Sequence, residues 1–191
     1  DSVLTSNLYN LTYMQINSRN ISDLTGIEDA INLTHCYAYD NNISFLDFSN
    51  NLNLEYVNLD DNYISQIDFS NNSNLRILDF RNNLVASLDV SNLHDLMWLS
   101  ISDNSNLEYI DLSQNISLEY LFIANCDSLN DLDLCNTFIV NLNSHNLDNN
   151  PNLFSIGVYD MLIADSVLTN VDPWVSFDLG CVGGGCTDPN A

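Results

Sequence analysis

A repeat of 21 to 22 residues constrains this chain more than any other feature. Six segments begin with a Leu that opens an L-x-x-L-x-L type pattern, and successive starts lie 22, 21, 21, 21 and 22 residues apart. They are LTYMQINSRN from Leu11, LTHCYAYDNN from Leu33, LEYVNLDDNY from Leu54, LRILDFRNNL from Leu75, LMWLSISDNS from Leu96 and LEYLFIANCD from Leu118. Weaker copies start at Ile139 and Leu153. About eight copies in near-constant register predict a solenoid with one coil per repeat.

The second half of each repeat has its own alternation of apolar and polar residues. The shared pattern is x-x-Φ-D-Φ-S/C-x-N, where Φ is apolar, and it occurs at 43–51, 64–72, 85–92, 107–115 and 128–136. Period-two alternation indicates an extended segment with one buried face. Two extended stretches in 21 residues leave no room for a long helix. We therefore predict a mainly β solenoid with little or no helix, in which a parallel sheet forms the concave face and short extended segments form the other, joined by Asn-rich turns.

The same pattern predicts the core. In two successive coils the inward side chains are expected to be Leu54, Val57, Leu59, Ile64, Ile67 and Phe69, then Leu75, Leu78, Phe80, Val85, Leu88 and Val90. Each buried side chain of this kind contributes about 1.5–3 kcal/mol. Cys36 falls at an inward strand position, and Cys126 and Cys135 replace an Asn and a Ser. We interpret the three as small core residues, with a bridge involving Cys126 or Cys135 as the alternative.

An Asn stands nine residues into most coils. A turn that passes beneath a strand leaves peptide groups pointing inward, and an Asn amide can both donate to them and accept from them. Stacked copies would form a ladder, although Asn also favours turns for local reasons. The predicted ladder consists of Asn41, Asn62, Asn83, Asn104 and Cys126.

The charge balance excludes several function classes. The chain carries 26 acidic and 3 basic residues, all three of them Arg, for a formal net charge of −23. Such a surface repels phosphate backbones and anionic lipid, so we expect no nucleic-acid partner. No run of 18 apolar residues is present, so membrane insertion is not expected. No zinc, phosphate-loop or nucleophile motif occurs, and we expect no enzyme activity.

Aromatic residues recur at the outward strand positions of the first sheet. The column before the first inward residue reads Tyr13, His35, Tyr56, Ile77, Trp98, Tyr120 and Asn141, and the next reads Gln15, Tyr37, Asn58, Asp79, Ser100, Phe122 and Asn143. Amphipathic aromatics suit protein and sugar partners, although they also favour strands and stack for stability alone. The predicted ligand-binding residues on the concave face are Tyr13, His35, Tyr37, Tyr39, Tyr56, Trp98, Tyr120 and Phe122.

Acidic residues surround the same face. Asp60, Asp61, Asp79 and Asp103 are expected at its rim, which favours a cationic or hydroxyl-rich partner. We expect Arg81 to neutralise Asp60 and Asp79 rather than to bind a ligand.

A second acidic column lies in the other half of the repeat. In register, its carboxylates would stand ~5 Å apart and repel one another. Two explanations could account for how this repulsion is offset. In the first, the neighbouring Ser residues donate hydrogen bonds to the carboxylates and water solvates the acidic face. The sharper alternative is weakly bound structural calcium. No other cofactor is expected. The candidate calcium ligands are Asp47, Asp68, Asp89, Asp111 and Asp133.

The spacing L-x-x-L-x-L-x-x-N/C resembles that of leucine-rich repeat proteins. The sequences of residues 20–33, 46–62 and 149–160 are similar to segments of secreted leucine-rich repeat proteins of marine, flavobacterial-type Bacteroidota. The tail GCVGGGCTDPNA (180–191) resembles the junction that precedes short Cys-containing repeats or a type IX secretion sorting domain in such proteins. The resemblance implies a secreted or cell-surface adhesion or binding module, and it brings no catalytic residues.

The predicted organisation is a solenoid over residues 1–160, with residues 1–10 giving partial N-terminal cover, a C-terminal cap over 161–180, and a linker over 181–191 to a downstream region. We expect an extracellular module that binds a protein or glycan on its concave aromatic sheet. One alternative is a structural unit of a surface appendage or filament that self-associates through the solenoid ends. The other is an accessory recognition domain of a larger secreted protein.

Overall fold

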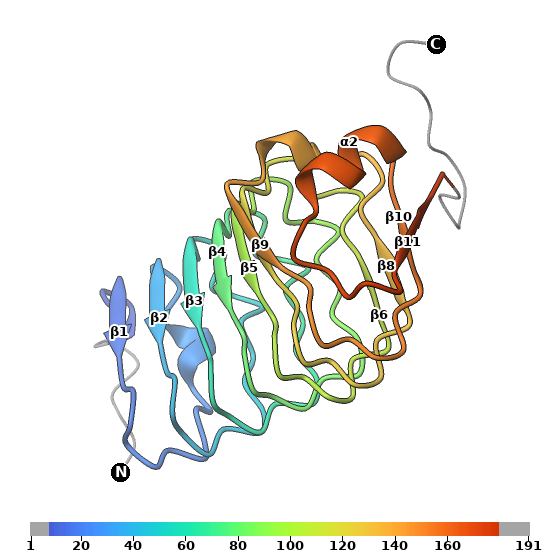
Figure 1. Cartoon of the computed structure of the whole chain (residues 1–191). Helices are drawn as coiled ribbons and strands as arrows, with labels where there is room; N and C mark the ends of the chain where they lie inside the picture. Colours follow the sequence, from blue (N-terminus) through green and yellow to red (C-terminus); the bar gives the residue numbers. More distant parts are fainter. Residues whose placement is uncertain (1–7, 180–191) are drawn as a thin grey trace.

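The computed structural model describes residues 8–179 and shows a stack of narrow coils that runs from the N-terminal coil at the left of the view to the C-terminal coils at the right. Seven short strands form one parallel sheet in the order β1-β2-β3-β4-β5-β7-β9 (Figure 1). Their bounds are β1 Tyr13–Gln15, β2 His35–Tyr37, β3 Tyr56–Asn58, β4 Ile77–Asp79, β5 Trp98–Ser100, β7 Tyr120–Phe122 and β9 Ser144–Asn146. The fold is therefore the predicted β-solenoid, with one strand of this sheet in each of seven coils.

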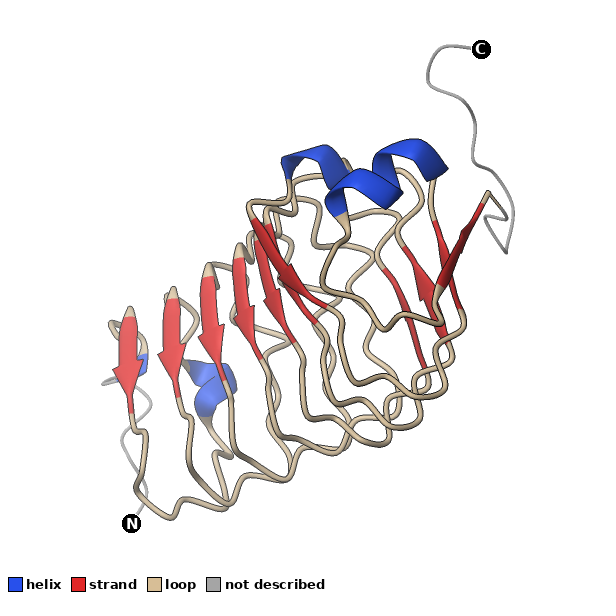
Figure 2. Cartoon of the chain, viewed as in Figure 1, coloured by secondary structure: helices blue, strands red, loops and turns tan. Residues whose placement is uncertain are grey.

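The opposite side of the solenoid is less regular. A four-stranded parallel sheet has the order β11-β10-β8-β6, and it occupies only the C-terminal half of the stack (Figure 2). The strands are β6 Tyr109–Asp111, β8 Asp131–Asp133, β10 Ser155–Gly157 and β11 Ser176–Asp178. In the earlier coils the same segment is extended but forms no strand. Phe48 and Phe69 fill the core there, and their rings stack with centroids 6.2 Å apart.

The helical content is small, and most of residues 8–179 lie outside helices and strands. Two 3-10 helices, η1 (Ile27–Asp29) and η2 (Ile139–Asn141), and one α-helix, α2 (Met161–Val167), are present among residues 8–179. The side chain of Asp160 caps α2 by accepting from the backbone N–H groups of Leu162 and Ile163. No helix of the described part of the chain has the length and apolarity required to span a bilayer.

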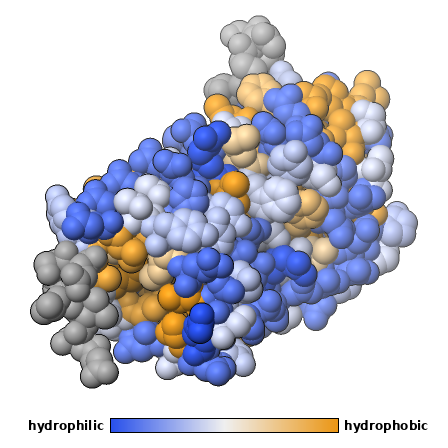
Figure 3. Space-filling view, turned by 90° about the vertical axis from the view of Figure 1, so that its left-hand side faces the viewer, coloured by the Kyte–Doolittle hydropathy of each residue, from blue (hydrophilic) through white to orange (hydrophobic). Residues whose placement is uncertain are grey.

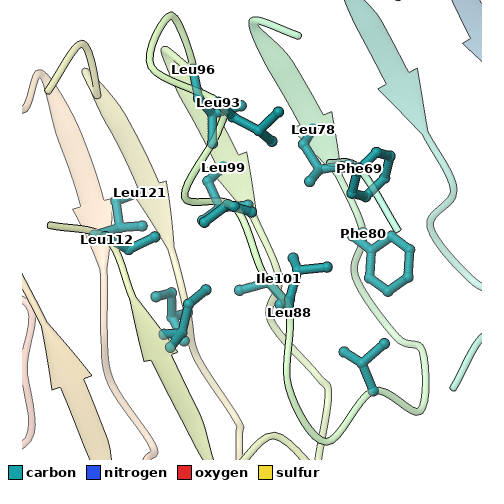
Figure 4. Close-up of a cluster of buried hydrophobic side chains, with 14 of the residues drawn as sticks. Phe69, Leu78, Phe80, Leu88, Leu93, Leu96, Leu99, Ile101, Leu112 and Leu121 are labelled. Atoms are coloured by element: carbon teal, nitrogen blue, oxygen red, sulfur yellow. The ribbon is translucent and has the colours of Figure 1, made fainter. Parts of the chain in front are cut away.

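The core runs through the middle of the stack. Of the twelve predicted core side chains, eleven are buried, and Ile67 is partly buried against the same cluster. Figure 4 shows how neighbouring coils contribute equivalent residues, with Leu78, Leu99 and Leu121 following one another along the solenoid. Each coil therefore buries its apolar residues only because another lies beside it.

The ends of the stack differ from its middle. In the first coil Leu11, Met14, Ile16 and Ile21 are only partly buried, whereas their equivalents in the second coil are fully buried. Figure 3 views the β1 end, where hydrophobic surface lies among hydrophilic residues. At the other end, α2 and β11 follow the seventh coil, and β11 pairs in parallel with β10. The proposed cap segment thus adds a strand to the second sheet.

The predicted start of the seventh coil is wrong. Strand β9 pairs Ser144 with Tyr120 and Asn146 with Phe122, so the outward columns continue at these two residues and not at Asn141 and Asn143. Asn141 instead belongs to η2, which accommodates three additional residues in the connection. The copy assigned to Leu153 is also misplaced, because β10 pairs with β8 in the second sheet and is the second half of the seventh coil.

Asn side chains bridge neighbouring coils at the predicted ladder positions. Asn62 donates from Nδ2 to the carbonyl oxygens of Ala38 and Leu59, each at 3.0 Å, and accepts at Oδ1 from the N–H of Ile43 at 3.0 Å. Asn41, Asn83 and Asn104 donate in the same way, and the thiol of Cys126 lies 3.7 Å from the carbonyl oxygen of Ile101. One amide thus pairs three backbone groups that would otherwise be buried without partners.

The ladder extends beyond the residues that the sequence indicated. Asn150 donates to Ile123 and Leu147 at 2.7 Å, and the carboxylate of Asp172 accepts from the N–H groups of Asn149 and Asn150. A second ladder, formed by Asn51, Asn72, Asn115 and Thr137, stabilises the other turn of the coil.

Backbone geometry explains the abundance of Asn and Asp in the turns. The residue that precedes each rung of the first ladder has a positive φ, and Asn and Asp adopt this left-handed conformation more easily than other side chains. These residues, with φ between 50° and 62°, are Asp40, Asp61, Asn82, Asp103, Asn125 and Asn149.

Candidate functional site

The outward side of the seven-stranded sheet carries the predicted binding residues. We call this surface, formed by the outward residues of β1 to β9 and the residues that directly follow them, the aromatic face. Of the eight predicted residues, seven lie on strands β1, β2, β3, β5 and β7, and Tyr39 follows β2. Parallel pairing places equivalent residues side by side from coil to coil. The face thus gathers side chains that lie more than 100 residues apart in the sequence.

Four rings form a stack at the N-terminal end of the aromatic face. The ring centroids of Tyr37 and Tyr56 lie 4.6 Å apart, and those of His35 and Tyr56 lie 6.0 Å apart with an angle of 8° between the planes. Tyr13 lies 5.9 Å from His35 and 5.2 Å from Tyr37. These distances are typical of offset-stacked aromatic pairs. Several ring faces are therefore turned toward one another, with Tyr13 about half exposed and the other three rings partly buried.

A second aromatic cluster lies further along the face. Trp98 is 5.0 Å from Tyr120 and 5.1 Å from Phe122 between ring centroids. Strand β4 separates the two clusters and contributes Ile77 and Asp79 in place of aromatics.

Asp79 links the two clusters by hydrogen bonds. Its Oδ1 accepts from the indole Nε1 of Trp98 at 2.7 Å, and its Oδ2 accepts from the hydroxyl of Tyr56 at 3.0 Å. Burial raises the pKa of the Asp79 carboxyl, and the two donors oppose that shift. Trp98 and Tyr56 therefore have a structural role as well as their place on the candidate binding surface.

Arg81 does not make the ion pair expected from the sequence. Its guanidinium lies 3.5 Å from the carboxylate of Asp103, while Asp60 accepts at Oδ1 from the backbone N–H of Arg81 at 2.6 Å. The charge of Arg81 still favours the ionised forms of Asp60 and Asp79. Burial nevertheless raises the pKa of Asp60 to about 6, with the charge of Asp79 adding to the effect.

A hollow of about 400 Å³ lies beside Trp98 on the aromatic face. Its volume is within the range of small-ligand sites. Carboxylates, hydroxyls, amides and two aromatic rings line it. The lining residues are Asn58, Asp60, Asp79, Arg81, Trp98, Ser100, Ser102, Asp103, Phe122, Ala124, Asn125 and Asn146. The sequence predicts Trp98 and Phe122 as binding residues and Asp60, Asp79 and Asp103 at the acidic rim, but it assigns no role to the buried Ser100 and Ser102.

The second acidic column forms local turns. Oδ1 of Asp47 accepts from the N–H of Ser49 at 2.8 Å, and Asp68, Asp89, Asp111 and Asp133 accept in the same way from the residue two positions later. These bonds lower the pKa of Asp47, Asp68 and Asp89, whereas burial raises that of Asp133. Within residues 8–179, no group of three or more His, Cys, Asp or Glu side chains has the arrangement of a metal site.

The cysteines fall into two groups. Cys36 and Cys126 are buried free thiols, and burial raises the pKa of Cys126 to about 11. Cys135 is disulfide-bonded, which corrects the simpler interpretation of this residue as a core filler. Cys181 and Cys186 lie outside the described residues.

A second hollow, of about 390 Å³, lies between η2 and α2 and is mainly apolar. Phe138 and Val140 at its rim are more than half exposed. No sequence pattern indicated it, because it forms at the irregular connection into the seventh coil, outside the repeat.

The solved structures similar to this chain are leucine-rich repeat proteins. The functional domain of InlJ from Listeria monocytogenes, which includes a cysteine ladder, matches at 25% identity and a TM-score of 0.62, over 94% of this chain and 42% of that chain. The internalin InlF from Listeria monocytogenes matches at 22% identity and a TM-score of 0.52, over 93% of this chain and 62% of that chain. A leucine-rich repeat protein of Leptospira interrogans matches at 21% identity and a TM-score of 0.56, over 83% of this chain and 40% of that chain.

These likenesses establish the leucine-rich repeat fold for this chain, which spans less than two thirds of the length of each of the three proteins. The sequence matches no protein-family model, and no curated protein is significantly similar to it.

Proposed function

We propose that this chain is a non-enzymatic protein-interaction module of a secreted or cell-surface protein, and that it binds its partner on the aromatic face. Stacked repeats form extended surfaces suited to such binding. The observation that carries the proposal is the aromatic face itself, where two ring clusters flank a hollow lined by polar groups. The leucine-rich repeat fold of the similar structures supports the same function.

The arrangement of the rings favours a protein over a glycan. A sugar ring binds best to an aromatic face that is free, but Tyr37 and Tyr56 stack on one another at 4.6 Å. What remains available is a set of ring edges, hydroxyls and carboxylates. A protein surface with donors and apolar side chains complements such a mixture.

A binding screen against extracellular proteins and glycans tests the proposal. Ser144→Trp places bulk on an exposed position of β9 beside Tyr120, and Asn130→Trp places the same bulk on an exposed position next to β8. A partner that uses the aromatic face will lose at least about tenfold in affinity to the Ser144 variant and little to the Asn130 variant.

Two results would contradict the proposal. Equal affinity of both variants for every captured partner would place binding elsewhere on the molecule. Assembly of the purified protein into filaments, detected by sedimentation and electron microscopy and unchanged in both variants, would favour a structural unit.

A further inference from the structure

The hollow beside Trp98 has an excess of negative charge. Asp60, Asp79 and Asp103 line it, and Arg81 is the one basic residue among its described lining residues. The Arg81 side chain is 55% exposed and makes a single contact to Asp103 at 3.5 Å. Such an exposed pair is weak, so it offsets little of the cost of keeping three carboxylates in one depression.

The carboxylates retain capacity to accept hydrogen bonds. Asp60 accepts at Oδ1 from the N–H of Arg81, and Asp103 accepts at Oδ1 from the amide of Asn125 at 2.8 Å. An ionised carboxylate can accept about four hydrogen bonds. Burial raises the pKa of both Asp60 and Asp79, which shows that nearby positive charge does not fully compensate for desolvation.

Ser100 gives a second and independent indication of a ligand. It is only 3% exposed, lies on the floor of the hollow, and makes no side-chain hydrogen bond to any residue between 8 and 179. Its neighbour Ser102, by contrast, accepts from the N–H of Ala124 at 3.0 Å. Between residues 8 and 179 the fully enclosed side-chain oxygens that lack a partner are those of Asn51, Asn72, Asn104 and Asn115, so the Ser100 hydroxyl is open to the hollow. A group bound there can complete its hydrogen bonds.

From this geometry we infer that the hollow binds an arginine side chain of the partner protein, with the guanidinium among Asp60, Asp103 and the hydroxyl of Ser100 and its stem against Trp98 and Phe122. A guanidinium presents five N–H donors in a plane and forms paired bonds with carboxylates. Aromatic walls favour it further through cation–π attraction. The net charge of −23 would steer a basic segment toward the protein. This inference rests on the proposed use of the aromatic face.

The probe for this site is the capped peptide acetyl-Gly-Arg-Gly-amide, with acetyl-Gly-citrulline-Gly-amide as an uncharged analogue of the same shape. Titration into the ¹⁵N-labelled chain is followed at the two indole N–H signals, Trp98 at the hollow and Trp174 outside it. We expect the arginine peptide to shift the Trp98 signal and to leave that of Trp174 unchanged. The citrulline peptide should produce no saturable shift.

Three variants locate the bound guanidinium. Asp103→Asn and Ser100→Ala should each weaken arginine-peptide binding, the former by about tenfold because a hydrogen bond to a charged group is lost. Asp47→Asn removes the same charge from the other side of the coil and keeps an oxygen for Ser49, so it should bind like the unaltered chain.

Equal shifts with the citrulline peptide, or equal losses in the Asp47 and Asp103 variants, would overturn the inference, since binding would then depend on shape or on net charge alone. Absence of any Trp98 shift would overturn it too. If the arginine inference failed but Ser144→Trp still prevented a protein partner from binding, the proposed function would remain supported.

Discussion

The indole of Trp98 donates to the carboxylate of Asp79 at 2.7 Å across the boundary between two coils. The same carboxylate accepts from Tyr56 on its other side, so one acidic residue joins aromatic side chains from the two repeats that flank its own. The aromatic face is thus held in place by its own hydrogen bonds before any partner binds.

A double-mutant cycle measures this link. Trp98→Phe keeps a ring but removes the N–H, and it should lower the free energy of unfolding by about 1.5 kcal/mol because Oδ1 of Asp79 loses its donor. In an Asp79→Asn background the same change should cost less, since the acceptor is no longer charged. Additive effects in urea unfolding would show that the two side chains are not coupled.

The inward and outward positions in the regular coils could be predicted from the sequence because the length of the repeat determines them. A strict spacing of 21 to 22 residues sets which side chains face inward, and burial of Leu54, Leu75 and Leu96 follows from it. The outward columns followed from the same spacing. The contact between Trp98 and Asp79 did not, because it depends on side-chain conformations across a coil boundary.

The prediction failed where the period changes. His145 occupies the inward position that Leu121 holds one coil earlier, so the L-x-x-L pattern that starts at Leu142 lacks its second Leu and the sequence favours Ile139 as the start. Nε2 of His145 accepts from the N–H of Thr169 at 3.1 Å, a contact that a repeat pattern does not contain. Burial also lowers the pKa of this imidazole, which favours the neutral form that can accept.

Removal of one Asn side chain of the first ladder should destabilise the whole stack of coils. Asn62→Ala leaves the carbonyl oxygens of Ala38 and Leu59 and the N–H of Ile43 without side-chain partners, and should cost about 3 kcal/mol in chemical unfolding. Asn42→Ala, at an exposed neighbouring position, is the matched control and should cost less than about 0.5 kcal/mol. Similar losses in both variants would mean that the rung has no special role.

Stability should depend on pH through Asp60. Because burial raises its folded pKa to about 6, above its unfolded value near 4, the folded state binds the extra proton. Stability from this group therefore increases as the pH falls from about 6 toward 4. Asp79, Asp61 and Arg81 are the charged groups that act on it.

Asp60→Asn tests that dependence, because the amide oxygen can still accept from Arg81. We expect the variant to melt about 2 °C higher than the unaltered chain at pH 7, and the difference to disappear near pH 4. A constant difference across this range would mean that Asp60 does not titrate there.

The melting temperature in different salts tests whether the second acidic column, Asp47 to Asp133, binds calcium or is stabilised by charge screening alone. Neighbouring carboxylates such as Asp111 and Asp133 lie in register, yet each already accepts from a backbone N–H two residues later. With a net charge of −23, added NaCl should raise the melting temperature by reducing repulsion. We expect CaCl₂ to add nothing beyond MgCl₂ at equal ionic strength, and EDTA to leave the transition unmoved. A calcium-specific increase that is lost in Asp111→Asn would instead establish a bound ion on this column, because only coordination, and not screening, separates the two cations.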